Sequence, residues 1–70
     1  MNNSKTFFLN GYEFYIMKDL TINEVLNYFD YKTNFFIIEY NNLICDRNDW
    51  SNIIINSNDT IEIITIVGGG

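Results

Sequence analysis

The chain has 70 residues, of which 47% are hydrophobic and 17% aromatic, and it carries a formal net charge of −5 at pH 7. This composition predicts one small folded domain, and the acidic balance argues against a nucleic-acid partner, because Lys and Arg must neutralise the phosphates. The lack of His and the single Cys argue against an internal disulfide, a metal site and imidazole catalysis, and no run is long and apolar enough to predict a membrane span.

The first two predicted elements form a β-hairpin. The runs "KTFFL" at Lys5–Leu9 and "YEFYI" at Tyr12–Ile16 are short and rich in aromatic residues, as strands often are. Between them lies Asn10-Gly11, the strongest short-range signal of a tight turn that joins two antiparallel strands. We therefore expect the first two strands to pair with each other.

The next run, "TINEVLNYF", predicts a short amphipathic helix. Thr21 and Glu24 stand three residues apart, which is the spacing of a capping box. Four apolar residues stand at i, i+3, i+4 and i+7, on one face of the helix: Ile22, Val25, Leu26 and Phe29. We expect the helix to end by about Thr33-Asn34.

The second half of the chain predicts three further strands. "FFIIEY" is a β-type run, Asn41-Asn42 predicts a turn, and "LIC" is a short strand behind it. "DRNDW" is typical of a loop or a single helical turn, "NSND" of a turn, and "TIEIITIV" of the last strand. The order β-β-α-β-β-β predicts an α+β domain of two layers, in which one amphipathic helix packs on one face of a mixed sheet of four to five strands.

The last predicted strand has two different faces. Because successive strand residues point to opposite sides, Ile61 and Ile63 share one side, whereas Glu62, Ile64 and Ile66 share the other. If Glu62 lies in water, the last two are apolar residues on a solvated face. We predict that Ile64 and Ile66 form a partner-docking surface. The alternative is the ordinary exposure of isoleucine on a strand.

The other chemically distinctive side chains are expected to have structural roles. Cys45 is expected to be a small core residue, and Trp50 an apolar anchor for the loop behind the fourth strand. Arg47 is expected to make a local hydrogen bond or ion pair. The carboxylates of the predicted turns are expected to be solvated: Asp46, Asp49 and Asp59. The sequence therefore assigns no catalytic residue, no cofactor-binding residue and no metal ligand.

The chain as a whole resembles the ThiS family, the small sulfur carriers of thiamine biosynthesis in the ubiquitin-like β-grasp group. The resemblance covers the chain from Phe7 to Gly70 and depends on three marks. These are the helix start "TINEVL", the turn at Asn41 followed by Arg47-x-x-Trp50, and the terminal glycines of "ITIVGGG". The molybdopterin carriers of the MoaD type share the fold and the tail, but the Arg-x-x-Trp segment fits the ThiS family better.

The resemblance implies a role for the end of the chain. Residues 1–67 would form the β-grasp domain and residues 68–70 a flexible glycine tail. A ThiF-like adenylating enzyme would consume ATP to activate the carboxylate of Gly70, a persulfide sulfur donor would convert it to a thiocarboxylate, and a ThiG-like thiazole synthase would take the sulfur. Gly68 and Gly69, which lack Cβ atoms, would thread the active sites of these partners. The protein would then be a co-substrate and not an enzyme.

Two other classes of function are alternatives to the sulfur carrier. One is a ubiquitin-like modifier that is attached to lysines through Gly70, and the other is an interaction module that binds through its sheet. The frequent use of Asn, Ile, Phe and Tyr, without Ala, Pro or Gln, is typical of an A/T-rich genome. We therefore expect a soluble protein in a reducing compartment, either a plastid stroma or a bacterial cytoplasm.

Overall fold

The computed structural model describes residues 4–29, 31 and 36–65. Its first two strands, β1 (Lys5–Leu9) and β2 (Tyr12–Ile16), form the predicted antiparallel hairpin. Asn10 and Gly11 join them with φ angles of 51° and 83°. Both angles lie in the left-handed region, which glycine adopts freely and asparagine more readily than most residues, so this dipeptide fits the turn.

The helix α1 spans Ile22–Tyr28 and begins with the predicted capping box. The Thr21 hydroxyl accepts a hydrogen bond from the backbone N–H of Glu24 at 3.1 Å, and the Glu24 carboxylate accepts one from the backbone N–H of Thr21 at 2.9 Å. The second of these bonds is the main reason why the pKa of Glu24 lies below its usual value. The helix start is thus stabilised by residues close together in the sequence.

The helix ends at Tyr28. Phe29 already has a φ of −88° and a ψ of 5°, and the N–H of Tyr31 donates to the carbonyl of Leu26 at 3.0 Å. This bond reaches back five residues and occupies a carbonyl that a longer helix would use for its own i to i+4 ladder. The helix thus ends before the predicted limit at Thr33-Asn34, two residues that lie outside the described residues. Within the described residues, no helix has the length and apolarity that a membrane span requires.

The second half of the structure contains three strands and a short 3-10 helix. Their bounds are Phe36–Tyr40 for β3, Leu43–Cys45 for β4, Arg47–Asp49 for the 3-10 helix η1 and Thr60–Thr65 for β5. Asn41 and Asn42 make the turn between β3 and β4 with φ angles of 51° and 72°. The predicted order of elements is confirmed.

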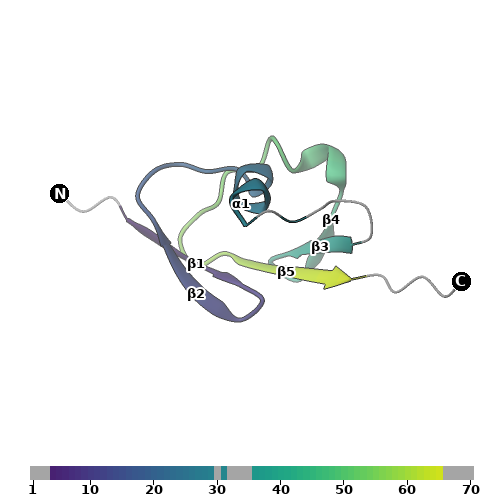
Figure 1. The fold of residues 1–70 in the computed structure, drawn as a ribbon, viewed down its shortest axis with the longest axis horizontal. Helices are drawn as coiled ribbons and strands as arrows, with labels where there is room; N and C mark the ends of the chain where they lie inside the picture. Colours follow the sequence, from purple (N-terminus) through teal and green to yellow (C-terminus); the bar gives the residue numbers. More distant parts are fainter. Residues whose placement is uncertain (1–3, 30, 32–35, 66–70) are drawn as a thin grey trace, which may run out of the picture.

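The five strands form one mixed sheet in the order β2-β1-β5-β3-β4. The last strand of the chain, β5, lies in the middle, parallel to β1 and antiparallel to β3. Figure 1 shows α1 on one side of the sheet, as the two-layer α+β prediction requires. We call the other side of the sheet, which α1 does not cover, the open face.

The core lies between α1 and the sheet. Its buried apolar side chains are Phe7, Leu9, Ile22, Val25, Leu26, Phe36, Ile38, Trp50, Ile55 and Ile61. The buried strand residues belong to β1, β3 and β5, and they alternate along each strand with residues of the open face. The sheet therefore has one apolar face that α1 covers. The residues of the open face do not contribute to this core.

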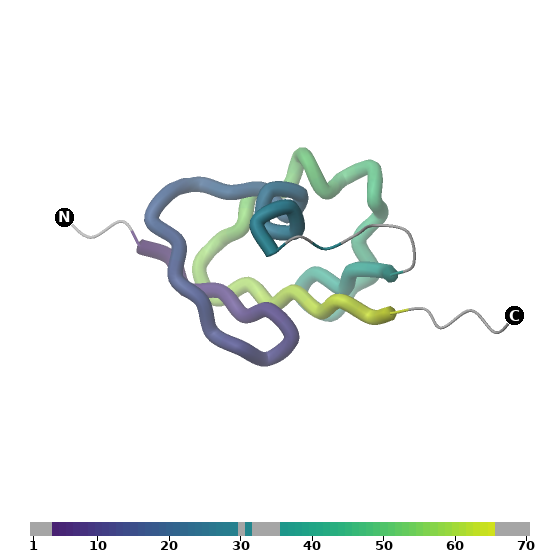
Figure 2. Tube along the Cα trace, viewed as in Figure 1, coloured from purple at the N-terminus to yellow at the C-terminus, as the bar shows by residue number. Residues whose placement is uncertain are grey.

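Two segments far apart in the sequence meet beside the helix start. Thr21 forms an isolated antiparallel bridge with Ile54, and the N–H of Ile55 donates to the carbonyl of Leu20 at 2.9 Å. Figure 2 shows the connection from η1 to β5 as it passes the start of α1 and then turns into the sheet. The connection is thus fastened to the helix layer before it enters the sheet as the central strand.

Candidate functional site

The predicted site lies at the end of β5, and the two ends of this strand are paired differently. Thr60 and Ile61 pair with β1, and Ile61 also pairs with β3. Ile64 and Thr65 pair with β3 alone among the strands that the structure describes. Figure 1 shows β5 pointing toward one end of the sheet. The strand thus leaves the centre of the sheet through its less enclosed end.

The side chains of β5 alternate between the two faces as the sequence predicts. Ile61 is 1% exposed and Ile63 is half-buried, whereas Glu62 is exposed and Ile64 is 39% exposed. This exposure permits a docking role for Ile64, which stays a prediction. The other predicted site residues lie outside the described residues: Ile66, Gly68, Gly69 and Gly70. The division of the chain into residues 1–67 and 68–70 likewise stays a prediction.

The open face beside Ile64 is partly apolar and partly acidic. The antiparallel register places Ile37 opposite Ile64, and Glu39 opposite Glu62. Ile44 of β4 is paired with Glu39 and is 70% exposed. Sequence reasoning found Ile64 but missed its neighbours on β3 and β4. Alternation along β3 and β4 could have shown which residues of each strand share a face. Their positions relative to β5 could not be predicted, because they depend on the strand order.

The first end of β5 is held by a buried carboxylate. Asp59 is 7% exposed and accepts hydrogen bonds from the Tyr40 hydroxyl, from the Asn41 side-chain amide at 3.1 Å and from the backbone N–H of Asn56 at 2.7 Å. The side-chain carbonyl of Asn41 accepts from the N–H of Thr60 at 2.8 Å. The prediction that Asp59 is solvated is wrong, because three donors satisfy its carboxylate inside the protein.

The segment behind β4 confirms one prediction and corrects another. Trp50 is 3% exposed and stacks on Phe36 with ring centroids 5.7 Å apart, so it is the predicted apolar anchor. The Arg47 guanidinium lies 4.9 Å from the centroid of the Trp50 ring. This contact is a cation–π interaction, where the sequence predicted a hydrogen bond or ion pair. Asp46 and Asp49 are exposed, as predicted, and Asp46 also caps η1.

Two side chains, one on β3 and one on β4, have raised pKa values. Burial is the main cause for the Cys45 thiol, and the nearby carboxylates of Asp49 and Asp46 add to it. Cys45 packs against the core but is only half-buried, and its raised pKa keeps it a neutral thiol and a weak nucleophile at pH 7. Burial, with the hydrogen bond to Asp59, raises the pKa of Tyr40 to about 12.

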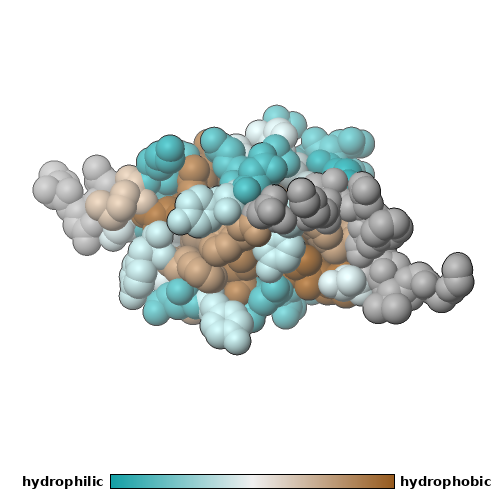
Figure 3. Space-filling view, in the orientation of Figure 1, coloured by the Kyte–Doolittle hydropathy of each residue, from teal (hydrophilic) through white to brown (hydrophobic). Residues whose placement is uncertain are grey.

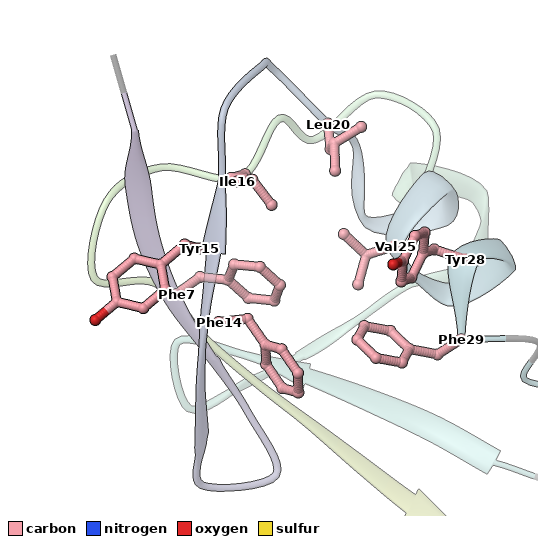
Figure 4. Close-up of a pocket in the computed structure, with 8 residues that line it drawn as sticks. All are labelled: Phe7, Phe14, Tyr15, Ile16, Leu20, Val25, Tyr28 and Phe29. Carbon is pink, nitrogen blue, oxygen red and sulfur yellow. The ribbon is translucent and has the colours of Figure 1, made fainter. Parts of the chain in front are cut away.

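A cavity that the sequence did not indicate lies between the hairpin and α1. Its volume is about 190 Å³, and its lining residues are Phe7, Phe14, Tyr15, Ile16, Leu20, Val25, Tyr28 and Phe29. Figure 4 shows most of these side chains pointing into the space, with the Tyr15 hydroxyl pointing away from it. Apolar surface gathers there in Figure 3. The Phe14 and Phe29 rings meet edge to face with centroids 5.0 Å apart, so this is a gap in the aromatic packing and contains no charged side chain.

The fold defines the class of the protein. A five-stranded mixed sheet with one helix on one face is the ubiquitin-like β-grasp fold that the sequence predicted. The solved structure of the thiamine biosynthesis protein ThiS from Geobacter metallireducens matches it with a TM-score of 0.79. The match covers 93% of this chain and 99% of that chain at 19% sequence identity, and therefore establishes the likeness of the fold alone.

Sequence comparisons establish the family. The ThiS family model matches residues 8–70. The uncharacterized protein ycf40 of Trieres chinensis is 47% identical over 70 residues, which cover 100% of this chain and 96% of that protein. The protein of the same name from Porphyra purpurea is 37% identical over 62 residues, which cover 89% of this chain and 87% of that protein. The chain belongs to the ThiS family, as the resemblance predicted.

Proposed function

We propose that this protein is a sulfur carrier for the thiazole part of thiamine. The observation that carries the proposal is the family match, which extends from residue 8 through Gly70 and so includes the glycine tail as well as the fold. The structure supports it by exposing Ile64 on the open face, near the end of β5 that leads to the tail. Docking through Ile64 and Ile66 would bring the tail to a partner active site.

The proposed chemistry begins at the carboxylate of Gly70. An ionised carboxylate is a poor electrophile and must first be activated. A ThiF-like adenylating enzyme joins the carboxylate to the α-phosphate of ATP and releases pyrophosphate. The terminal sulfur of a persulfide donor then attacks the acyl carbon and displaces AMP, and a thiol splits the acyl disulfide by forming a disulfide with the donor sulfur. A thiocarboxylate is left on Gly70 for a ThiG-like thiazole synthase.

In this scheme the protein is a co-substrate that contributes no catalytic residue and holds no cofactor, since the partner enzyme binds the ATP. Gly68 and Gly69 suit two different active sites, because a chain without Cβ atoms passes through narrow channels. Ordering such a tail costs about 1–2 kcal/mol per residue, which keeps each complex dissociable. The need for persulfides and free thiols fits a reducing compartment, and we propose a plastid stroma or a bacterial cytoplasm.

Intact-mass spectrometry tests the proposal. The full-length protein is incubated with ATP, a ThiF-like enzyme and a persulfide donor, and we expect its mass to rise by the difference between one sulfur and one oxygen. Conjugates of higher mass, linked to lysine, would indicate a ubiquitin-like modifier, and an unchanged mass would leave only the interaction module. Delivery of the sulfur to a molybdopterin synthase partner, and not to a thiazole synthase, would indicate a MoaD-type carrier.

A further inference from the structure

The open face holds two like charges at positions where a stable sheet avoids them. Glu39 of β3 and Glu62 of β5 are direct cross-strand partners in the antiparallel register. Residues so paired have Cβ atoms about 4.5–5.5 Å apart, and like charges there destabilise the sheet. Glu62 is exposed and Glu39 is half-buried, so both carboxylates lie on the open face. Their placement does not serve the stability of the free protein.

The basic side chains that the structure describes are engaged elsewhere. Lys5 forms an ion pair with Asp19 at 2.8 Å. The Arg47 guanidinium lies over an indole ring behind β4. Lys18 lies close enough to the helix start to lower the pKa of Glu24. Within the described part of the chain, no basic side chain is therefore left to offset the two carboxylates of the open face.

The surroundings of the two carboxylates suit a long side chain from another molecule. A shallow hollow on this side of the sheet is lined by Phe8, Gly11, Asn42, Thr60, Ile61 and Glu62. A Cβ added to Gly11 would meet no atom within 4 Å. On the other side of the carboxylates, Ile44 and Ile64 expose apolar surface. An aliphatic stem fits against such surface while its charged end reaches a carboxylate.

We propose that the open face binds a partner surface that presents an arginine, with the guanidinium between Glu39 and Glu62 and with apolar partner residues over Ile44 and Ile64. A guanidinium carries five donors in a planar fork, so it can bridge two carboxylates, which a single ammonium does less well. The net charge of −5 favours the approach of such a basic surface. The inference rests on the proposed function, since the partner is the ThiF-like adenylating enzyme.

The proposal predicts opposite effects of the same substitution on the free protein and on the complex. In the double variant Glu39→Gln and Glu62→Gln, we expect the midpoint of thermal unfolding to rise by about 1–5 °C, because the repulsion is gone. We expect the affinity for the ThiF-like enzyme, measured by calorimetry, to fall about 10-fold, with a weaker dependence on salt. In Glu62→Lys, which pairs with Glu39 and repels an arginine, both effects are larger.

Asp49→Asn is the matched control, because it removes one exposed carboxylate that lies on η1, away from the open face. It is expected to leave both the affinity and the unfolding midpoint unchanged. An equal loss of affinity in this control would overturn the proposal, because net charge alone would then explain the binding. Wild-type affinity and salt dependence in the double variant, or a fall in its unfolding midpoint, would also overturn it.

Binding and sulfur loading, measured on the same proteins, distinguish a failure of this inference from a failure of the proposed function. A wild-type protein that accepts sulfur, with a double variant that binds as tightly as the wild type, refutes the arginine site and leaves the sulfur carrier standing. A wild-type protein that binds the enzyme through the two glutamates but never accepts sulfur supports the site and refutes the carrier. A wild-type protein that does not bind the enzyme refutes both.

Discussion

The two ends of β5 differ in how they are paired and buried. At the first end, Ile61 is buried between two neighbouring strands, and the carboxylate of Asp59 joins the β3–β4 turn to the start of β5 through hydrogen bonds. At the last end, Ile64 is 39% exposed and pairs with β3 alone among the described strands. The first end contributes to the stability of the fold, whereas the last end exposes an apolar side chain to solvent.

The polar groups around Asp59 and those of the open face also differ. Among the described residues, no buried side-chain nitrogen or oxygen lacks a hydrogen-bond partner, and Asp59 is the one buried charged side chain. On the open face, by contrast, Glu39 stands opposite Glu62 without a neutralising charge. Sequences tend to break a local rule of stability at functional positions, and this contrast is the reason why we propose a binding site on the open face.

Removal of Gly69 and Gly70 gives the largest expected effect on function. Sulfur loading should vanish completely, because the proposed acyl group is gone, while the midpoint of thermal unfolding should not change, because glycine supplies no side chain for burial. Intact-mass spectrometry and a thermal melt measure the two results. Deletion of Asn2 and Asn3 is the control with the same number of residues and should load normally. Loading of the tail-deleted protein would contradict the tail assignment.

The substitution Asp59→Ala should cause the largest loss of stability. The free energy of unfolding should fall by about 3 kcal/mol, because the donors of Tyr40, Asn41 and Asn56 lose a charged acceptor inside the protein. Urea denaturation measures this loss, and the fraction that stays folded should still accept sulfur. The control Asp49→Ala, at an exposed position, should change the free energy of unfolding by less than about 0.5 kcal/mol. Equal losses in both variants would contradict a buried network.

The substitution Ile64→Ala should weaken partner binding and have little effect on stability, the opposite of Asp59→Ala. The affinity for the ThiF-like enzyme should fall about 10-fold, whereas the free energy of unfolding should fall by less than about 1 kcal/mol, because the side chain is already 39% exposed. Calorimetry and urea denaturation provide the two values. Ile54→Ala is the matched control, since Ile54 is 46% exposed but lies beside the helix start. Similar losses of affinity in both variants would show that Ile64 has no special role.

The features that could be predicted from the sequence depend on residues close together in it. Asn10-Gly11 sets the hairpin turn, Thr21 and Glu24 cap the helix, and alternation along β5 assigns Ile61 and Ile64 to opposite faces. In each case, two to five neighbouring residues determine the geometry. The family resemblance added predictions of the β-grasp fold and of a role for the tail. The role of the tail stays a prediction, because Gly70 lies outside the described residues.

The features that the sequence did not indicate depend on residues that are far apart. Asp59 resembles a turn residue until the fold brings Tyr40 and Asn41 to its carboxylate. Glu39 and Glu62 became a repulsive pair only when the strand order placed β3 beside β5. The cavity between the hairpin and α1 likewise depends on how two separate elements pack. Local patterns carry no information on such contacts.

The smallest expected effect concerns Tyr40 at alkaline pH. Burial and the hydrogen bond to Asp59 raise its pKa from 10.0 to about 12 in the folded protein. The folded state thus favours the neutral phenol, and this contribution to stability is complete below pH 10.0 and is lost as the pH rises through about 12. Urea denaturation at several alkaline pH values should show a decline that is weaker in Tyr40→Phe.

An ultraviolet absorbance titration checks the assignment. The difference between the titrations of the wild type and of Tyr40→Phe isolates the ionisation of this one phenol. Its pKa should be about 12 and not the ordinary 10.0. Glu24→Gln is a control that disturbs the helix cap and leaves the phenol unchanged. If the isolated step lies at the ordinary value, Tyr40 does not donate to Asp59 in solution. The network around Asp59 at the first end of β5 would then lack one of its three donors.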